Sequence, residues 1–354
     1  MSQLVTQPAT TSAVTSHLVE ARGVDVVYEP RGGQRIWAVR NVDLTLEQGE
    51  FVGLVGESGC GKSTLGYALT GMLRPPARLQ AGQIRIAGTD IAGLDAEGLR
   101  RQRQHGFAIV LQSGMNALNP VRTIEKHFSD ILRAHAERGQ RPDAASVRAE
   151  AGELLERVKL DRDVLGRYPH ELSGGMRQRV AIAMALSLQP RMIIFDEPTT
   201  ALDVIVQAAV VETIKELQRE QGFTAMLITH DLGVVLDVTD RTMVMYAGRI
   251  VEDQPSRALL SGTHHPYTAA LLGCYADPTA EVVRLGGVPG TPPDLSERLE
   301  GCSFAPRCSR VEDLCHRVEP ELTPLGLGRA ACHVTAAERT AKLETAELEP
   351  KGAG

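Results

Sequence analysis

The sequence feature that most constrains the fold is a glycine-rich segment that reads Gly56-Glu57-Ser58-Gly59-Cys60-Gly61-Lys62-Ser63. It matches the pattern G-x-x-x-x-G-K-[ST], and it lies between an apolar run, FVGLVG, and a segment compatible with a helix, STLGYALTGML. In this setting, successive backbone N–H groups and the helix N-terminus form a concave site for a polyphosphate. We therefore predict that the loop binds nucleotide phosphates through Gly56, Ser58, Gly59, Cys60, Gly61, Lys62, Ser63 and Thr64.

Within this loop, Lys62 is placed to reach the β- and γ-phosphates, and the hydroxyl of Ser63 can bind Mg²⁺. The alternative is a glycine turn beside a chance lysine, which the flanking strand and helix disfavour. A dinucleotide-binding fingerprint is excluded, because Thr64 occupies the position of its third glycine.

Two adjacent carboxylates, Asp196 and Glu197, end a second apolar run that starts at Met192. The carboxyl ends of central strands are where α/β sheets bind ligands. We expect Asp196 to hold Mg²⁺ and Glu197 to polarise the water that attacks the γ-phosphate. The alternative is an acidic pair at the start of a helix.

A third motif, LSGGMRQR, spans residues 172–179 and precedes the apolar segment VAIAMALSL. Taken alone, it predicts a helix capped by Ser173 and entered through two glycines. In isolation the motif indicates no more than a well-capped helix, so it gains a functional meaning only beside the other two.

Strands and helices alternate along most of the chain, which predicts an α/β fold with a mainly parallel sheet. Residues 18–56 contain short β-branched runs, and residues 90–106 and 122–168 have helical composition. RMIIFDE and TAMLITH read as buried strands, and TMVMYAGRIVE reads as a hairpin at the sheet edge. Composition changes after Pro266, where we place a domain boundary.

Composition excludes several classes of protein. No apolar stretch is long enough to span a bilayer, and the N-terminus lacks the features of a secretion signal. The formal net charge of −6, without a block of lysine or arginine, gives no reason to expect a nucleic-acid partner. Without an export signal, the six cysteines favour metal, redox or core roles over disulfides.

The order of these motifs resembles that of the ATP-binding subunits of ABC transporters, over roughly residues 20 to 260. The resemblance includes the glycine loop, Gln112, LSGGMRQR, IIFDE, Ala201-Leu202-Asp203 and His230. It implies a P-loop NTPase core with an N-terminal antiparallel β subdomain, an inserted helical subdomain at about residues 113–180 and a small cysteine-containing C-terminal extension. We divide the chain into a disordered arm (1–18), an ATPase domain (19–263), the extension (264–336) and a flexible tail (337–354).

The resemblance also implies roles for single residues. Tyr28 stacks on adenine, Gln112 senses Mg²⁺ and the attacking water, and His230 contacts the γ-phosphate. A strand-core position is the alternative for Tyr28. The sequence QSGMNALNP departs from the family after Gln112, because the usual acidic residue or proline is missing there. In the family, an opposite subunit contacts the nucleotide through residues that correspond to Ser173, Gly174, Gly175, Gln178 and Asp203.

The C-terminal part looks like the extension of oligopeptide and dipeptide importer ATPases, through HPYT at 265–268, PGTPPDL at 289–295 and GCSFAPRC at 301–308. This resemblance implies ATP-driven import of peptides, with nickel or oligosaccharide uptake as alternatives. It implies two transmembrane permease subunits, a second and different ATPase subunit, an extracytoplasmic solute-binding protein and a place on the cytoplasmic face of the membrane. A non-transport ABC ATPase is less favoured, because the chain shows one cassette and no sustained heptads.

Four of the six cysteines, Cys302, Cys308, Cys315 and Cys332, fall within about thirty residues. Four thiolates can bind a [4Fe-4S] cluster or Zn²⁺. The absence of a C-x2-C pair weakens zinc, and the family resemblance favours the cluster. Reduced cysteines without metal remain the other alternative, which is also what we expect for Cys60 and Cys274.

Overall fold

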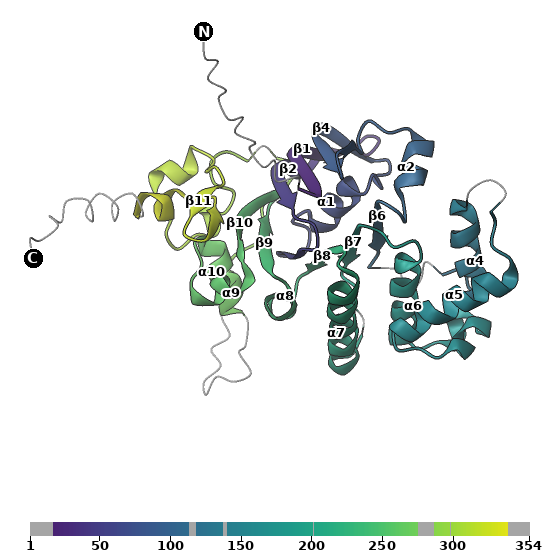
Figure 1. Ribbon diagram of the computed structural model, residues 1–354. Coiled ribbons are helices and arrows are strands. Elements are labelled where there is room, and N and C mark those ends of the chain that lie inside the picture. Colours follow the sequence, from purple (N-terminus) through teal and green to yellow (C-terminus); the bar gives the residue numbers. More distant parts are fainter. Residues whose placement is uncertain are drawn as a thin grey trace, which may run out of the picture.

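The computed structural model in Figure 1 describes residues 17–112, 118–136, 140–200, 202–274, 287–297 and 299–338. Two sheets organise the cassette. The first has four antiparallel strands in the order β2-β1-β4-β5. Its strands are β1 (Val19–Tyr28), β2 (Ile36–Leu46), β4 (Ala77–Ile86) and β5 (Thr89–Asp90).

The second sheet has eight strands in the order β11-β12-β10-β9-β3-β8-β7-β6. Its centre is parallel, through the pairs β3–β8, β3–β9, β7–β8 and β6–β7. Strands β3, β7 and β8 are buried along their whole length, which explains their uninterrupted apolar sequences. The bounds are β3 (Phe51–Val55), β6 (Phe107–Val110), β7 (Met192–Asp196), β8 (Thr224–Thr229), β9 (Arg241–Tyr246), β10 (Arg249–Pro255), β11 (Thr323–Leu325) and β12 (Gly328–Ala330).

Some helices follow strands of the second sheet along the chain, and others form a separate block beside it. Figure 1 shows α4, α5 and α6 grouped at the opposite end of the molecule from β11. The long helix α7 has one buried face and ends at Gly222, whose φ of 67° is left-handed. The α-helices are α1 (Lys62–Leu69), α2 (Ala96–Gln102), α4 (Ile124–His135), α5 (Ala144–Arg157), α6 (Gly174–Leu186), α7 (Val204–Gln221), α8 (Leu232–Val238), α9 (Ser256–Ser261) and α10 (Pro266–Gly273). Among the described helices, none combines the length and apolar character that crossing a bilayer requires.

The C-terminal extension continues the second sheet. Strands β9 and β10 form the expected antiparallel hairpin, but its position at the sheet edge was predicted wrongly, because β12 pairs with β10 and β11 pairs with β12. Two short 3-10 turns, Ala305–Arg307 and Asp313–His316, lie between α10 and these strands. Residues 1–16 and 339–354, most of the expected arm and tail, lie outside the described residues, and Leu18 is already buried.

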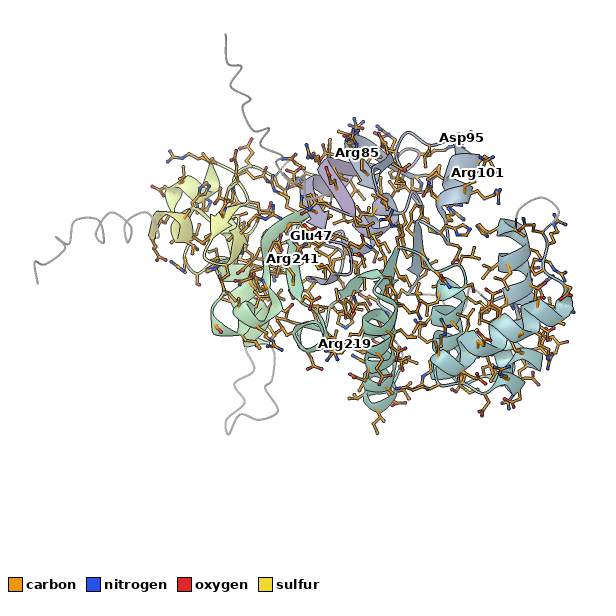
Figure 2. All side chains as sticks on the ribbon, viewed as in Figure 1. Glu47, Arg85, Asp95, Arg101, Arg219 and Arg241 are labelled. Atoms are coloured by element: carbon orange, nitrogen blue, oxygen red, sulfur yellow. The ribbon has the colours of Figure 1, made fainter. Side chains whose placement is uncertain are left out.

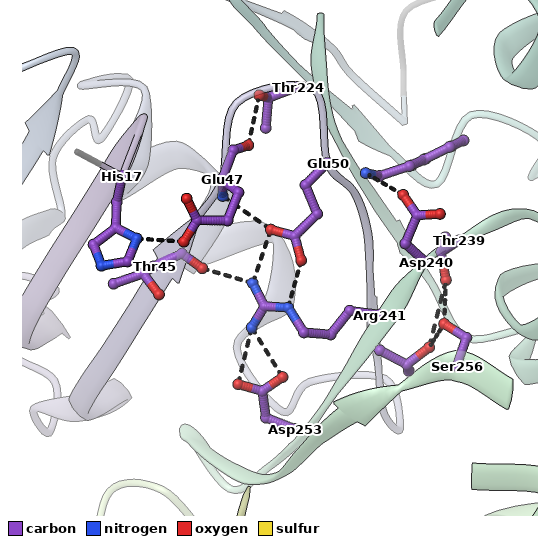
Figure 3. A network of polar contacts seen from close by, with 12 residues as sticks. His17, Thr45, Glu47, Glu50, Thr224, Thr239, Asp240, Arg241, Asp253 and Ser256 are labelled. Atoms are coloured by element: carbon purple, nitrogen blue, oxygen red, sulfur yellow. Dashed lines mark hydrogen bonds and ion pairs between the residues drawn. The ribbon is translucent and has the colours of Figure 1, made fainter. Parts of the chain in front are cut away.

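A partly buried arginine joins the two sheets. Arg241 of β9 forms ion pairs with Glu50 and Asp253 and donates to the Thr45 carbonyl of β2 at 2.7 Å (Figure 3). In contrast, the Arg85, Asp95, Arg101 and Arg219 labelled in Figure 2 are exposed. The Arg241 network therefore holds the first sheet at a defined distance from the sheet that carries the glycine loop.

Candidate active site

The glycine loop runs from the end of β3 to the start of α1, as predicted. Gly61 has a φ of 107°, and a Cβ atom there would lie 2.1 Å from the Ala38 carbonyl oxygen, so only glycine fits. The Lys62 ammonium folds back into the loop, where it donates to the carbonyls of Gly56 at 2.7 Å and Glu57 at 3.0 Å. No side chain caps α1, so the first backbone N–H groups of this helix are not satisfied by a cap.

A cavity of about 680 Å³ lies in front of this loop. It gathers residues from the first sheet, the glycine loop, the ends of β6, β7 and β8, and the C-terminal extension. The lining residues are Tyr28, Ile36, Ala38, Ser58, Gly59, Gly61, Lys62, Ser63, Thr64, Gln112, Glu197, Thr200, His230 and Leu295. Gly56 and Cys60 of the predicted loop do not line it.

Asp196 lies buried behind Ser63. The Ser63 hydroxyl donates to Asp196 Oδ1 at 2.7 Å, while Oδ2 is buried and has no hydrogen-bond partner among the described residues. Burial raises the pKa of Asp196, and the hydroxyls of Ser63 and Tyr67 oppose that shift. A hydroxyl next to an unsatisfied carboxylate oxygen is a donor set that suits Mg²⁺, which prefers oxygen ligands.

Glu197 follows directly and is held by three side chains. Thr200 Oγ1 donates to its Oε2 at 2.7 Å, Gln112 Nε2 donates to the same oxygen at 3.2 Å, and His230 Nδ1 lies 3.4 Å from Oε1. The φ of Glu197 is 45°, which is strained for a residue with a side chain. The structure thus joins three residues that are far apart in the sequence around one carboxylate.

Tyr28 also lines the cavity. Its hydroxyl and Thr64 Oγ1 share a hydrogen bond of 3.1 Å, and Ile36 of the neighbouring strand lines the same cavity. The tyrosine is half-buried and lies at the end of β1. An aromatic ring and an aliphatic side chain there offer an apolar surface for a planar base.

The motif at residues 172–179 forms the start of α6 but does not line the cavity. Ser173 is exposed and caps the helix by accepting from the Met176 N–H at 3.3 Å. Gly175 packs closely against α7, because a Cβ atom there would lie 2.5 Å from Val206 Cγ1. Asp203 caps α7 by accepting from the Val206 N–H at 2.9 Å. Gln178, by contrast, is only 1% exposed.

Four cysteines of the extension line one small cavity, together with His265, Phe304 and Arg310 among others. These cysteines are Cys302, Cys308, Cys315 and Cys332, and all are free thiols. Burial raises the pKa of Cys302 to about 11 and also raises that of Cys308. Within the described part of the chain, no group of three or more His, Cys, Asp or Glu side chains has the spacing to hold a single metal ion. Cys60 is buried and Cys274 is exposed, both as free thiols.

Comparison with known proteins identifies the family. The model of the ABC transporter family matches residues 39–200, and that of the oligopeptide/dipeptide transporter C-terminal region matches residues 251–315. A protein of Brucella ovis with the provisional name of peptide import ATP-binding protein is 40% identical over 319 residues, which cover 86% of this chain and 93% of that protein. The chain belongs to the ATP-binding subunits of ABC transporters, in the oligopeptide/dipeptide branch.

Other relatives of this ABC subunit agree. The oligopeptide transport ATP-binding protein OppD of Mycobacterium tuberculosis is 40% identical over 321 residues, which cover 90% of this chain and 52% of OppD. The solved dimeric structure of the ATP-binding cassette MJ0796, bound to ADP and Pi, is similar with a TM-score of 0.61 and 30% identity. It covers 68% of this chain and 99% of MJ0796. The predicted family and the predicted α/β fold class are both confirmed.

Four lining residues of the cavity were not predicted from the sequence: Ile36, Ala38, Thr200 and Leu295. Thr200 could have been predicted from the sequence, because it lies three residues after Glu197. In the structure, a hydrogen bond from its N–H to the Glu197 carbonyl closes the turn between them. Leu295 could not have been predicted in this way, since it lies beyond the predicted boundary of the ATPase domain.

Proposed function

We propose that this chain binds MgATP in the cavity before the glycine loop and hydrolyses it to power peptide import through separate permease subunits. One observation carries the ATPase proposal. Asp196 keeps an unsatisfied buried oxygen beside Ser63, while the adjacent Glu197 is oriented by Gln112, Thr200 and His230. A metal-binding acid next to a positioned base is the arrangement that phosphoryl transfer to water requires.

Each group of residues has a distinct part. The loop from Gly56 to Thr64 offers backbone N–H groups to the phosphates, and Lys62 exchanges its carbonyl partners for phosphate oxygens. Ser63, Asp196 and Gln112 would hold Mg²⁺, which when bound neutralises charge on the phosphates. Glu197 accepts a hydrogen bond from the attacking water and orients it, and His230 lies where it can contact the γ-phosphate. Tyr28 supplies a face for adenine.

The second half of the site comes, in this proposal, from another ATPase subunit. Ser173, Gly174, Gly175 and Asp203 lie away from the cavity of their own chain, and Ser173 is exposed. Next to Asp203, Val204 and Ile205 are 82% and 83% exposed, which is unusual for two adjacent aliphatic residues. A dimer that pairs the helix α6 of one subunit with the glycine loop of the other would account both for the exposed Ser173 and for the exposed Val204 and Ile205. Gln178 is buried, so its part in that contact requires it to become accessible.

Peptide import follows from the relatives named for peptide or oligopeptide transport and from the matching C-terminal region. We infer two permease subunits, a related but different second ATPase, a solute-binding protein that delivers the peptide, and a peripheral position on the cytoplasmic face. The helical block of α4, α5 and α6 carries the motion to the permease, because it joins the core through the segment after Gln112.

The four cysteines of the extension line one small cavity, and four thiols are a donor set that would suit a [4Fe-4S] cluster. Cys302, Cys308, Cys315 and Cys332 would hold it. Anaerobic purification followed by assays of iron, acid-labile sulfide and zinc tests this proposal, and a folded protein free of all three contradicts it.

The ATPase proposal is tested on the assembled transporter by comparing Glu197→Gln with Glu212→Gln, an exposed glutamate of α7. Without the base, hydrolysis should fall by roughly 10²- to 10⁴-fold, while MgATP binding persists and traps a closed dimer. The control should hydrolyse ATP and import peptide at the normal rate. Normal hydrolysis by Glu197→Gln would remove this carboxylate from catalysis.

A further inference from the structure

An arginine of the C-terminal extension reaches into the glycine loop. Arg307 lies in the 3-10 turn Ala305–Arg307 and is only 8% exposed. Its guanidinium forms a two-pronged ion pair with Glu57, through Nη1 to Oε2 at 2.7 Å and Nη2 to Oε1 at 3.0 Å. Glu57 is the residue directly after the first glycine of the loop. Such paired hydrogen bonds fix both the distance and the angle between two groups.

The arginine is itself held from several sides. Nε donates to the Pro289 carbonyl at 2.6 Å, and the guanidinium also donates to the carbonyls of Val288 and Gly290 and to the Tyr246 hydroxyl. Its carbon Cζ lies 5.7 Å and 5.9 Å from the ring centres of Tyr246 and Phe304. Glu57 therefore pairs with a guanidinium whose position is already fixed.

Every polar group of Glu57 has a partner. Besides the carboxylate held by Arg307, its N–H donates to the Tyr267 hydroxyl of α10 at 2.8 Å, and its carbonyl accepts from Lys62 and from the Cys60 N–H at 3.3 Å. Two of these partners, Arg307 and Tyr267, belong to the extension. Lys62 is the partner that the proposed nucleotide takes over, so the extension would supply both side-chain contacts that remain once phosphate binds.

A second segment of the extension lines the cavity in front of the glycine loop. The Leu295 carbonyl accepts from the Trp37 N–H at 3.0 Å, beside Ile36 of β2. Leu295 lines the cavity together with Ile36 and Tyr28. The extension thus lines the cavity through Leu295 and contacts the glycine loop through Arg307.

We propose that the extension is a working part of the nucleotide site, with Arg307 as a positioning residue that sets the glycine loop through Glu57. This inference rests on the proposed function, because it assumes that the cavity binds ATP. Arg307 does not touch the nucleotide. It fixes the first turn of the loop, so that the N–H groups beyond Gly59 face the phosphates without an entropic cost on binding.

The test compares MgATP binding and hydrolysis by four variants of the full chain: Arg307→Met, Arg307→Lys, Glu57→Gln and the double variant Arg307→Met/Glu57→Gln. Arg317→Met is the control. Arg317 is an exposed arginine of the same extension. Arg307→Met and Glu57→Gln should each raise the Kd and the KM for MgATP roughly tenfold, with kcat changed less than about twofold. Arg307→Lys should recover part of the affinity, because it keeps a positive charge near Glu57.

The double variant separates positioning from general support of the fold. If Arg307 acts through Glu57, the double variant should bind MgATP as weakly as either single variant and no weaker. Additive losses would overturn the proposal, as would an unchanged Kd in Arg307→Met. If Arg307→Met fails to fold, Glu57→Gln still decides, because it leaves the other contacts of Arg307 in place.

Lys62→Ala, measured in parallel, distinguishes this inference from the proposed function. Loss of MgATP binding in Lys62→Ala together with normal binding in Arg307→Met overturns only the inference. Normal binding in both variants overturns the nucleotide site itself.

Discussion

The glycine loop and the turn at residues 172–175 are both helix starts entered through glycines, but they differ in what lies before them. The first turn of α1 has no side-chain cap and lines the cavity, whereas α6 is capped by its own Ser173 and does not line that cavity. A capped and exposed helix start needs nothing further from its own chain. In the proposed function, one chain therefore supplies a phosphate loop for its own cavity and, at Ser173, a separate surface for a second subunit.

The two helix starts also differ in how firmly they are anchored. The glycine loop is held at Glu57 by Arg307 and Tyr267, which come from parts of the chain far from the loop. Among the described residues, the Ser173 side chain is held by a local hydrogen bond from the Met176 N–H. In the proposed function, the glycine loop must be in place before ATP binds, and its long-range contacts suit that role. The turn at Ser173 is capped by its own helix, which suits a surface that a second subunit brings to the nucleotide later.

The largest expected effect comes from removing the cation of the loop. In Lys62→Ala, the MgATP affinity of the isolated chain should fall by about 2 to 5 kcal/mol, because a charged partner of the phosphates is lost. Lys126→Ala, at an exposed lysine of α4, serves as the control. Isothermal titration measures the affinity, and an unchanged Kd would contradict a phosphate contact of Lys62.

A smaller effect is expected at the turn, and only in the assembled dimer. Ser173→Arg places a bulky cation at the exposed cap, so hydrolysis by the complex should fall roughly 10- to 100-fold through loss of a hydrogen bond to a charged phosphate. MgATP binding by the isolated chain should not change. Ser146→Arg, at an exposed serine in the first turn of α5, is the matched control. Loss of MgATP binding by the isolated Ser173→Arg chain would contradict the proposed difference between the two helix starts.

The smallest expected effect concerns pH and the support of the glycine loop. His265 caps α10, the helix that carries Tyr267, by accepting from the Tyr267 N–H at 3.1 Å, and burial lowers its pKa to about 4. Above pH 6.5, the ring is neutral in both the folded and the unfolded chain. As the pH falls through 6.5 towards 4, the unfolded chain takes up a proton that the folded chain does not, so stability falls.

This difference in proton binding should lower the free energy of unfolding α10 by about 1 kcal/mol between pH 7.5 and pH 6, while that of α6 stays unchanged. Hydrogen exchange of residues 266–273 and 174–186 measures both helices at the two pH values. His265→Asn keeps a capping acceptor and should remove the pH dependence, whereas His316→Asn, at an exposed histidine, should not. Equal pH dependence in His265→Asn and the unchanged protein would rule out this residue as the cause.

Much of the fold was predictable because it depends on short-range patterns. The strand, loop and helix around Lys62 and the buried run ending at Asp196 each show their structure within a dozen residues, and the confirmed α/β class follows from their alternation. The grouping of Gln112, Glu197 and His230 was expected from the family resemblance, and its geometry became visible only in the structure.

The contacts of the extension could not be predicted, for a physical reason. Arginine is common and can pair with any carboxylate, so nothing near Arg307 in the sequence selects Glu57 over other acids. The same holds for β12, whose three residues give no periodicity and whose partner β10 is chosen by the geometry of the completed sheet. Such choices depend on long-range packing, which local patterns do not encode.

The ion pair between Glu57 and Arg307 also bears on how the protein is made. The two residues are 250 positions apart, so at about 5 to 20 residues per second the ribosome needs roughly 10 to 50 s after Glu57 to add Arg307. During that interval, the cassette emerges and folds with Glu57 still without its guanidinium partner. Because the extension is synthesised last, a chain cut short before residue 307 would carry every motif of the nucleotide site but lack the side chain that holds its first turn.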